Sequence, residues 1–121
     1  MRQLRFASFQ VKDLEASKVF YVSKLGFEIG ESKNPEACLF KSNKGEAMFA
    51  IRKPLSNLDH KELGIGISLW FATDEKIENL YAKLLEKEVI VLGGINETPF
   101  GKTIIIQDPD GYKVTFLEGH N

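Results

Sequence analysis

Apolar and polar residues alternate along residues 4–11, which is the pattern of a β-strand with two different faces. One face carries Ala7, Phe9 and Val11, and the other carries Phe6, Ser8 and Gln10. The spacing then changes to that of a helix, whose predicted inner side is made of Ala16, Val19, Phe20 and Ser23. Asp13 is the expected N-cap and Gly26 the expected stop. Three further strands are predicted at residues 27–31, 37–41 and 47–52, with residues 42–45 as the turn between the last two.

The same order of elements returns in the second half, after a linker at residues 53–63 that has no periodicity. A strand at 65–72 leads to Asp74, a candidate cap, and to a helix with a constant offset from the first, since Ile77 follows Ala16 by 61 positions. The inner side of this helix is predicted to carry Ile77, Leu80, Tyr81 and Leu84. Strands at 89–91, 102–107 and 112–117 complete the second repeat, with the Asp108-Pro109-Asp110-Gly111 turn before the last strand. Residues 1–121 are therefore predicted to be one domain with internal repeats at about 1–52 and 64–121.

This duplication predicts an α+β fold with two βαβββ modules, because one helix covers only one face of a four-stranded sheet. The two curved half-barrel sheets are expected to place their open faces around a cleft, where a small ligand would bind. Alternation assigns side chains to those open faces. They are Phe6, Ser8, Gln10, Met48, Ala50, Arg52, Gly66, Ser68, Trp70, Lys113, Thr115 and Leu117.

From these positions we predict a ligand-binding site made of Phe6, Ser8, Met48, Arg52, Ser68, Trp70, Phe100 and Thr115. Trp70 is either a stacking plate for a planar or cationic ligand or a residue of the core or of a subunit contact. Arg52 either pairs with an anionic group of the ligand or is an ordinary surface arginine. The Pro99-Phe100-Gly101 segment is a tight turn, or it carries Phe100 to the rim of the cleft.

The candidate chemistry of the chain is limited. A catalytic metal needs at least three converging protein ligands, yet the two histidines, His60 and His120, lie outside the predicted strands. The acidic residues cluster in helices and turns, as on a solvated surface. We therefore predict no catalytic residues, no metal and no cofactor.

Charge and composition limit the kinds of partner and the compartment that we expect for this chain. The 121 residues carry a net charge of -1, so we expect no binding to nucleic acid, and no segment is apolar enough to span a membrane. Cys38 is the only cysteine, which fits a reducing cytoplasm, and its apolar neighbours indicate a packing role rather than a reactive thiol.

Several short motifs resemble those of the vicinal oxygen chelate (VOC) superfamily, which contains glyoxalase I, bleomycin-resistance proteins and dioxygenases. They are Val11-Lys12-Asp13-Leu14, Phe20-Tyr21, Leu25-Gly26-Phe27 and Asp108-Pro109-Asp110-Gly111-Tyr112. In this order, and with the duplication, they cover nearly the whole chain. The resemblance implies four metal-ligand positions in the metal-dependent relatives, and these fall on Phe6, Ala50, Ser68 and Thr115.

None of these four residues is a good catalytic metal ligand, so the resemblance is closest in style to the metal-free bleomycin-resistance branch. That branch has an aromatic strand and a P-W-G-like or P-F-G-like turn, matched here by Trp70-Phe71 and Pro99-Phe100-Gly101. Its members are homodimers that sequester a flat cationic drug at the subunit interface.

The sequence therefore predicts a cytoplasmic homodimer that binds a small, partly aromatic molecule without transforming it. One alternative is a lyase, isomerase or dioxygenase-like enzyme, working with an atypical metal site or without metal. Another is a protein-interaction role, in which the side chains of the dimer fill the cleft.

Overall fold

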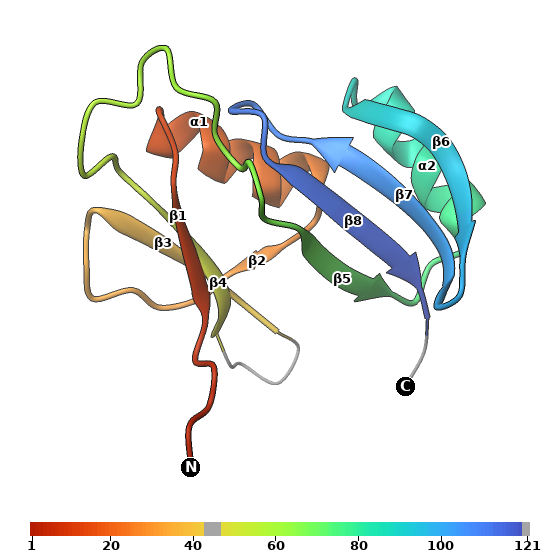
Figure 1. Cartoon of the computed structure of the whole chain (residues 1–121), viewed down its shortest axis with the longest axis horizontal. Helices are drawn as coiled ribbons and strands as arrows, with labels where there is room; N and C mark the ends of the chain where they lie inside the picture. The colour runs from red at the N-terminus through yellow and green to blue at the C-terminus, as the bar shows by residue number, and fades with distance from the viewer. Residues whose placement is uncertain (43–46, 120–121) are drawn as a thin grey trace. The chain divides into compact units, whose positions relative to one another are not determined.

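The computed structural model describes residues 1–42 and 47–119, and the chain divides into two compact units, Met1–Lys61 and Glu62–Asn121. Each unit has the order strand, helix and three strands, and each strand set forms one four-stranded mixed sheet (Figure 1). The predicted α+β fold with two βαβββ modules is confirmed. The turn expected at 42–45 and His120 lie largely or wholly outside the described residues.

The first unit contains one sheet in the order β1-β4-β3-β2, with β1 parallel to β4. Its elements are β1 (Ala7–Gln10), α1 (Leu14–Val19), the π-helix η1 (Phe20–Lys24), β2 (Glu28–Ile29), β3 (Ala37–Lys41) and β4 (Ala47–Arg52). The helix begins as expected, because the Asp13 carboxylate accepts a hydrogen bond from the Ala16 N–H at 3.1 Å. It stops at Gly26, whose φ of 82° is a left-handed conformation that favours glycine.

An aromatic cluster forms the core of this unit, between the helix and the sheet. Phe49 on β4 is its centre, with 1% of its surface exposed. Its ring stacks on Phe40 at a centroid distance of 4.7 Å and on Phe9 at 6.0 Å, and it meets Tyr21 and Phe27 edge-on. Such offset and edge-to-face contacts add stability beyond the burial of apolar surface.

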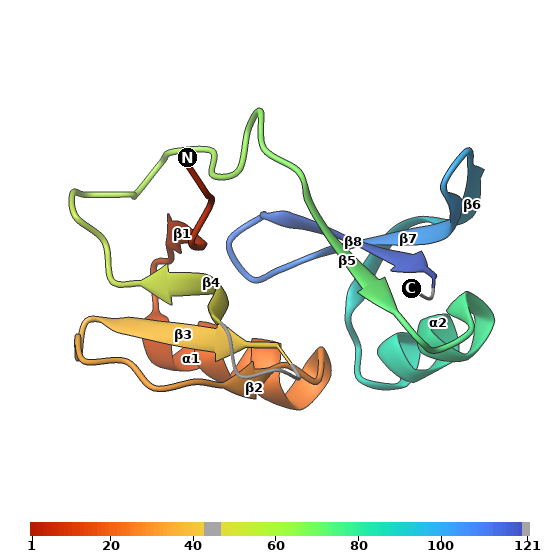
Figure 2. The ribbon, with the colours of Figure 1, turned by 90° about the horizontal axis from the view of Figure 1, so that it is seen from below.

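The second unit repeats this architecture in the order β5-β8-β7-β6, with β5 parallel to β8. Its elements are β5 (Leu69–Thr73), α2 (Ile77–Glu86), β6 (Ile90–Thr98), β7 (Gly101–Gln107) and β8 (Lys113–Glu118). Figure 2 shows α2 on one side of this sheet. The predicted inner side of α2 is confirmed, since Ile77, Leu80 and Leu84 are buried and Tyr81 is half-buried.

The last two strands are joined by the predicted turn. The buried Asp108 carboxylate accepts hydrogen bonds from the N–H groups of Asp110 and Tyr112, at 2.9 and 2.8 Å. The start of α2 differs from the prediction, because Asp74 does not cap it. The Glu118 carboxylate, at the end of β8, instead accepts from the Ile77 N–H at 2.8 Å. This cap depends on the tertiary fold and leaves no local pattern in the sequence.

Three other predictions are wrong in detail. The first helix turns Leu14, Ser17, Phe20 and Tyr21 inward, whereas Ala16, Val19 and Ser23 are exposed. The strands predicted at 4–11, 27–31 and 65–72 are shorter, and the one predicted at 89–91 extends to Thr98. Alternation along 65–72 predicts that Ile65 and Ile67 face the helix together with Leu69 and Phe71. They instead lie before β5 and are 73% and 49% exposed.

Candidate functional site

The open face of the second sheet, opposite α2, is defined by the strand register. Trp70 on β5 lies beside Thr115 on β8, and Thr115 lies beside Ile105 on β7. Side chains opposite one another in a sheet share a face, which gives the members of this surface. They are Trp70, Ala72, Lys113, Thr115, Leu117, Thr103, Ile105, Gln107, Ile90, Leu92 and Asn96. Leu69, Phe71, Val114 and Phe116 alternate with them and face the helix.

Trp70 is the largest side chain of this open face and is 47% exposed. Its indole N–H donates a hydrogen bond to the Ser68 hydroxyl at 2.7 Å. Its ring also meets the Phe100 ring edge-on, at a centroid distance of 6.2 Å and an interplanar angle of 84°. Two contacts therefore orient the indole while a large part of its surface stays open to solvent.

Phe100 reaches Trp70 from the turn of the β6–β7 hairpin. Pro99 and Phe100 form the two-residue loop between the paired residues Thr98 and Gly101. The Thr98 hydroxyl donates to the Gly101 carbonyl at 2.7 Å and accepts from the Phe100 N–H at 3.1 Å. Gly101 has a φ of 132°, and a Cβ there would lie 3.1 Å from the Glu118 carbonyl oxygen. The expected tight turn is thus confirmed, and it holds Phe100 against the tryptophan.

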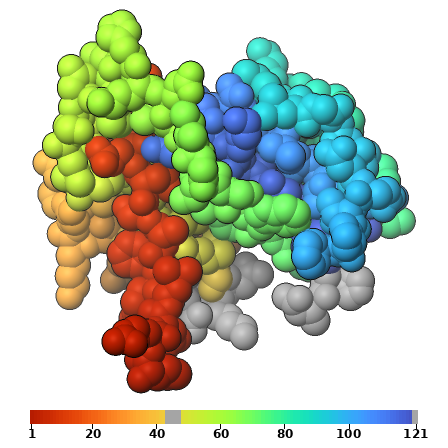
Figure 3. Space-filling view, in the orientation of Figure 1, coloured from red at the N-terminus to blue at the C-terminus, as the bar shows by residue number. Residues whose placement is uncertain are grey.

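A bulge curves β6 on its way to this turn. Leu92 pairs with Ile105 and Asn96 pairs with Thr103, so residues 93–95 lie opposite Ile104 alone. Gly93 and Gly94 have φ values of 86° and 129°, which side-chain-bearing residues rarely adopt. Figure 1 looks onto the open side of the sheet and shows the bent β6 ribbon, and Figure 3 shows β5 and the β6–β7 hairpin at the surface.

The open face of the first sheet is defined in the same way. Ser8 lies beside Ala50, and Gln10 lies beside Arg52. Ser8 is exposed, Met48 is half-buried and Ala50 is buried. Phe6 lies just before β1 and Ser68 just before β5, so these two residues occupy corresponding positions of the two units.

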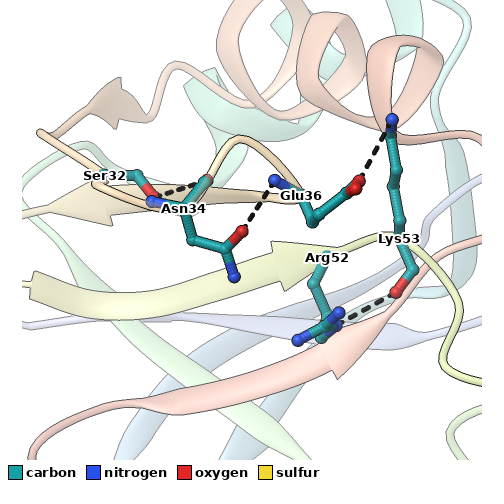
Figure 4. Close-up of polar contacts among 5 residues, drawn as sticks. All are labelled: Ser32, Asn34, Glu36, Arg52 and Lys53. Atoms are coloured by element: carbon teal, nitrogen blue, oxygen red, sulfur yellow. Dashed lines mark hydrogen bonds and ion pairs between the residues drawn. The ribbon is translucent and has the colours of Figure 1, made fainter.

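Arg52 is half-buried at the end of β4, and its Nε–H donates to the Lys53 carbonyl at 3.0 Å. The neighbouring carboxylate of Glu36 pairs with the Lys53 ammonium at 3.2 Å. Figure 4 shows the Lys53 side chain running toward Glu36, whereas the Arg52 side chain runs to the other side of the strand. In the same loop, the Asn34 amide oxygen accepts from the Glu36 N–H at 2.9 Å, and the Ser32 hydroxyl bonds the Asn34 backbone.

Comparison with known protein families identifies the family of this chain. Residues 3–116 match the Glyoxalase family, described as the Glyoxalase/Bleomycin resistance protein/Dioxygenase superfamily. The chain belongs to this superfamily. A search of curated proteins gave no significant match.

Solved structures of the superfamily fold cover almost the whole chain. A superfamily member from Sphaerobacter thermophilus is 23% identical, with 98% of each chain covered and a TM-score of 0.76. The antibiotic-binding protein TnmS3 from a Streptomyces species is 21% identical, with 99% of this chain and 98% of that chain covered and a TM-score of 0.74. Lactoylglutathione lyase from Agrobacterium tumefaciens is 20% identical, with coverages of 97% and 93% and a TM-score of 0.73. At these identities the likeness shows the fold.

The four positions that the family resemblance assigns to metal ligands do not suit a catalytic metal. Phe6 and Ala50 offer no donor atom in the first unit. In the second unit the Ser68 hydroxyl is engaged by Trp70, and Thr115 is only 4% exposed. Within residues 1–42 and 47–119, no group of three or more His, Cys, Asp or Glu side chains is arranged to hold a metal ion. His60 is exposed in the linker.

Two titratable groups near the core are shifted toward their neutral forms. Burial raises the pKa of the Cys38 thiol, which is consistent with the predicted packing role. Burial also raises the pKa of the Tyr112 hydroxyl, with a further contribution from the Asp108 and Asp110 charges. Neither shift creates a nucleophile at neutral pH.

The structure thus places Ser68, Trp70 and Phe100 together in one unit, and it places Ser8, Met48 and Arg52 on the open face of the other. Thr115 shares the face of Trp70 but offers almost no surface. Sequence reasoning missed the bulge at Gly93-Gly94 and the role of Thr98. Two adjacent glycines after a predicted strand were the only signal for that bulge.

Proposed function

We propose that this chain binds a small, partly aromatic molecule on the open face of a sheet and does not transform it. The observation that carries this proposal is Trp70, a half-exposed indole held in place by Ser68 and Phe100. A fixed aromatic plate reduces the ordering cost of binding, because the receiving side chain is already positioned. For each open face taken by itself, we also propose ligand contacts to Phe6, Ser8, Met48 and Arg52 in the first unit and to Thr115 in the second.

The antibiotic-binding relative supports a binding role, and the lactoylglutathione lyase supports the enzyme alternative. The poor metal-ligand chemistry at Phe6, Ala50, Ser68 and Thr115 favours binding over a metal-dependent lyase, isomerase or dioxygenase. A metal-free site of the bleomycin-resistance style therefore remains our proposal.

An unbiased thermal-shift screen of small molecules tests the proposed function. We expect aromatic compounds to be enriched among those that raise the melting temperature, because binding to the native state alone stabilises it. Mass spectrometry of each hit after prolonged incubation should recover it unchanged. Conversion of a hit into a product would favour the enzyme alternative.

Chelator treatment tests the metal-free proposal. Removing divalent ions is expected to leave the melting temperature unchanged, since a structural or catalytic metal bound only to the native state would contribute to stability. A drop of several degrees that is reversed by one particular divalent ion would contradict this expectation.

We also propose a cytoplasmic homodimer. The buried thiol of Cys38, the only cysteine, suits a reducing compartment, and no helix within the described residues is long and apolar enough to cross a membrane. Exposed apolar side chains such as Val19, Ile65 and Ile90 offer surface for a subunit contact. Light scattering is expected to give twice the chain mass of 13.7 kDa. A monomer at all accessible concentrations would contradict the dimer.

A further inference from the structure

The charged side chains of the second sheet lie on different faces of it. Lys102, Glu97 and Glu118 alternate to the helix side, where each has a neighbour of suitable charge or polarity. The Lys102 ammonium pairs with Glu78 of α2 at 2.7 Å, and the Glu118 carboxylate caps the same helix. Lys113 instead lies on the open face, beside Gln107 of β7.

Lys113 shares this open face with the tryptophan. Trp70 is paired with Thr115, and Lys113 lies two residues before Thr115 on the same strand. The strand spacing and the rise per residue put the Cα atoms of Trp70 and Lys113 about 8 Å apart. Lys113 is exposed, so its long side chain can reach a molecule that is stacked on the indole.

The first sheet independently shows a charge of the same sign on its open face. Arg52 lies on that face beside Gln10, whereas the nearby Glu36 carboxylate pairs with Lys53. Glu28 and Lys41, which are cross-strand neighbours in the same sheet, pair with each other at 3.9 Å. Each sheet, taken by itself, therefore presents a cationic side chain on its open face, Arg52 in the first and Lys113 in the second.

We propose that the molecule held on Trp70 is an organic anion, in which a planar conjugated group stacks on the indole and a carboxylate or similar group pairs with Lys113. This inference rests on the proposed binding function and names its ligand class. An anionic ligand differs from the flat cationic drug that the resemblance to the bleomycin-resistance branch implies. A cation on Trp70 would lie close to the Lys113 ammonium, and like charges repel at that range.

Three probes with the same ring and different charge test this ligand class. Naphthoate, naphthalenemethanol and naphthylmethylamine are titrated into the full chain by isothermal titration calorimetry. We expect naphthoate to bind about 10-fold more tightly than the amine, with an affinity that falls as salt is added. The alcohol should lie between the two.

A charge variant assigns the effect to one residue. Lys113→Gln is expected to weaken naphthoate binding about 5- to 10-fold and to leave naphthalenemethanol unchanged, because only the anion gains from the ammonium. Lys33→Gln, at an exposed position between β2 and β3, removes the same charge elsewhere and should change neither affinity.

The outcomes separate this inference from the proposed function. If the amine or the alcohol binds as tightly as naphthoate, or if Lys113→Gln behaves as Lys33→Gln does, the anionic ligand class is wrong while aromatic binding stands. If none of the three probes binds, Trp70 is not an aromatic site, and the proposed function fails together with the inference.

Discussion

Replacing Phe49 with alanine is expected to lower the free energy of unfolding by about 3–5 kcal/mol. Phe49 is 1% exposed and contacts the rings of Phe9, Tyr21, Phe27 and Phe40. Its removal leaves a cavity that the surrounding rings cannot fill without losing their own packing. Denaturant unfolding followed by circular dichroism measures this loss, which is a large fraction of the stability of a small domain.

Phe100→Ala is the matched control for that experiment, because it makes the same chemical change at a side chain that is 75% exposed. We expect it to change stability by no more than about 0.5 kcal/mol. Equal losses in the two variants would contradict the assignment of Phe49 to the centre of the first core.

Trp70→Ala is expected to weaken ligand binding by about 1–3 kcal/mol, which corresponds to a loss of about 5- to 150-fold in affinity. The indole offers its exposed surface for stacking, while Ser68 and Phe100 hold it in place. Calorimetry with the best compound of the thermal-shift screen measures the change. The cost in stability should be clearly smaller than that of Phe49→Ala.

Trp70→Phe is the conservative partner of this variant. It keeps an aromatic surface but removes the hydrogen bond to Ser68, so we expect an affinity between those of the wild type and Trp70→Ala. If Trp70→Ala instead unfolds the protein as severely as Phe49→Ala does, the tryptophan is structural and does not support ligand binding.

The regular elements could be predicted from the sequence where one local pattern dominates. The bounds predicted for β3 and β4 are those observed, and the inner side of α2 follows from its 3.6-residue period. The duplication could be predicted because strand-type and helix-type spacings of apolar residues follow in the same order in both halves. These features depend on local alternation of apolar and polar residues, which a single sequence displays directly.

The errors arise where tertiary contacts decide the local structure. In the first helix, Leu14, Ser17 and Tyr21 share a helical spacing and are buried, whereas Ala16 and Val19 on the predicted side are exposed. A π-helical turn follows at Phe20–Lys24. Before β5, positive φ values of 82° and 81° at Gly64 and Gly66 interrupt the extended backbone, although the side chains of this segment alternate. The sequence pattern alone does not distinguish this turn from a strand.

The candidate site was partly predictable from the alternation of side chains along β5. Alternation was enough to place Trp70 opposite the helix-facing Phe71, whereas its contact with Phe100 depends on the curvature of β6. The burial of Thr115 was not predictable, because alternation assigns a face but gives no measure of how deeply a small side chain lies within it.

Tryptophan fluorescence tests the central claim most directly, because Trp70 is the only tryptophan of the chain and any change reports on one site. The best stabilising compound of the screen is titrated into the wild-type protein, and the compound is recovered afterwards for mass spectrometry. We predict a saturable change in Trp70 emission and an unchanged compound. Emission that stays constant while the compound still stabilises the protein, or recovery of a chemically altered compound, would contradict the account.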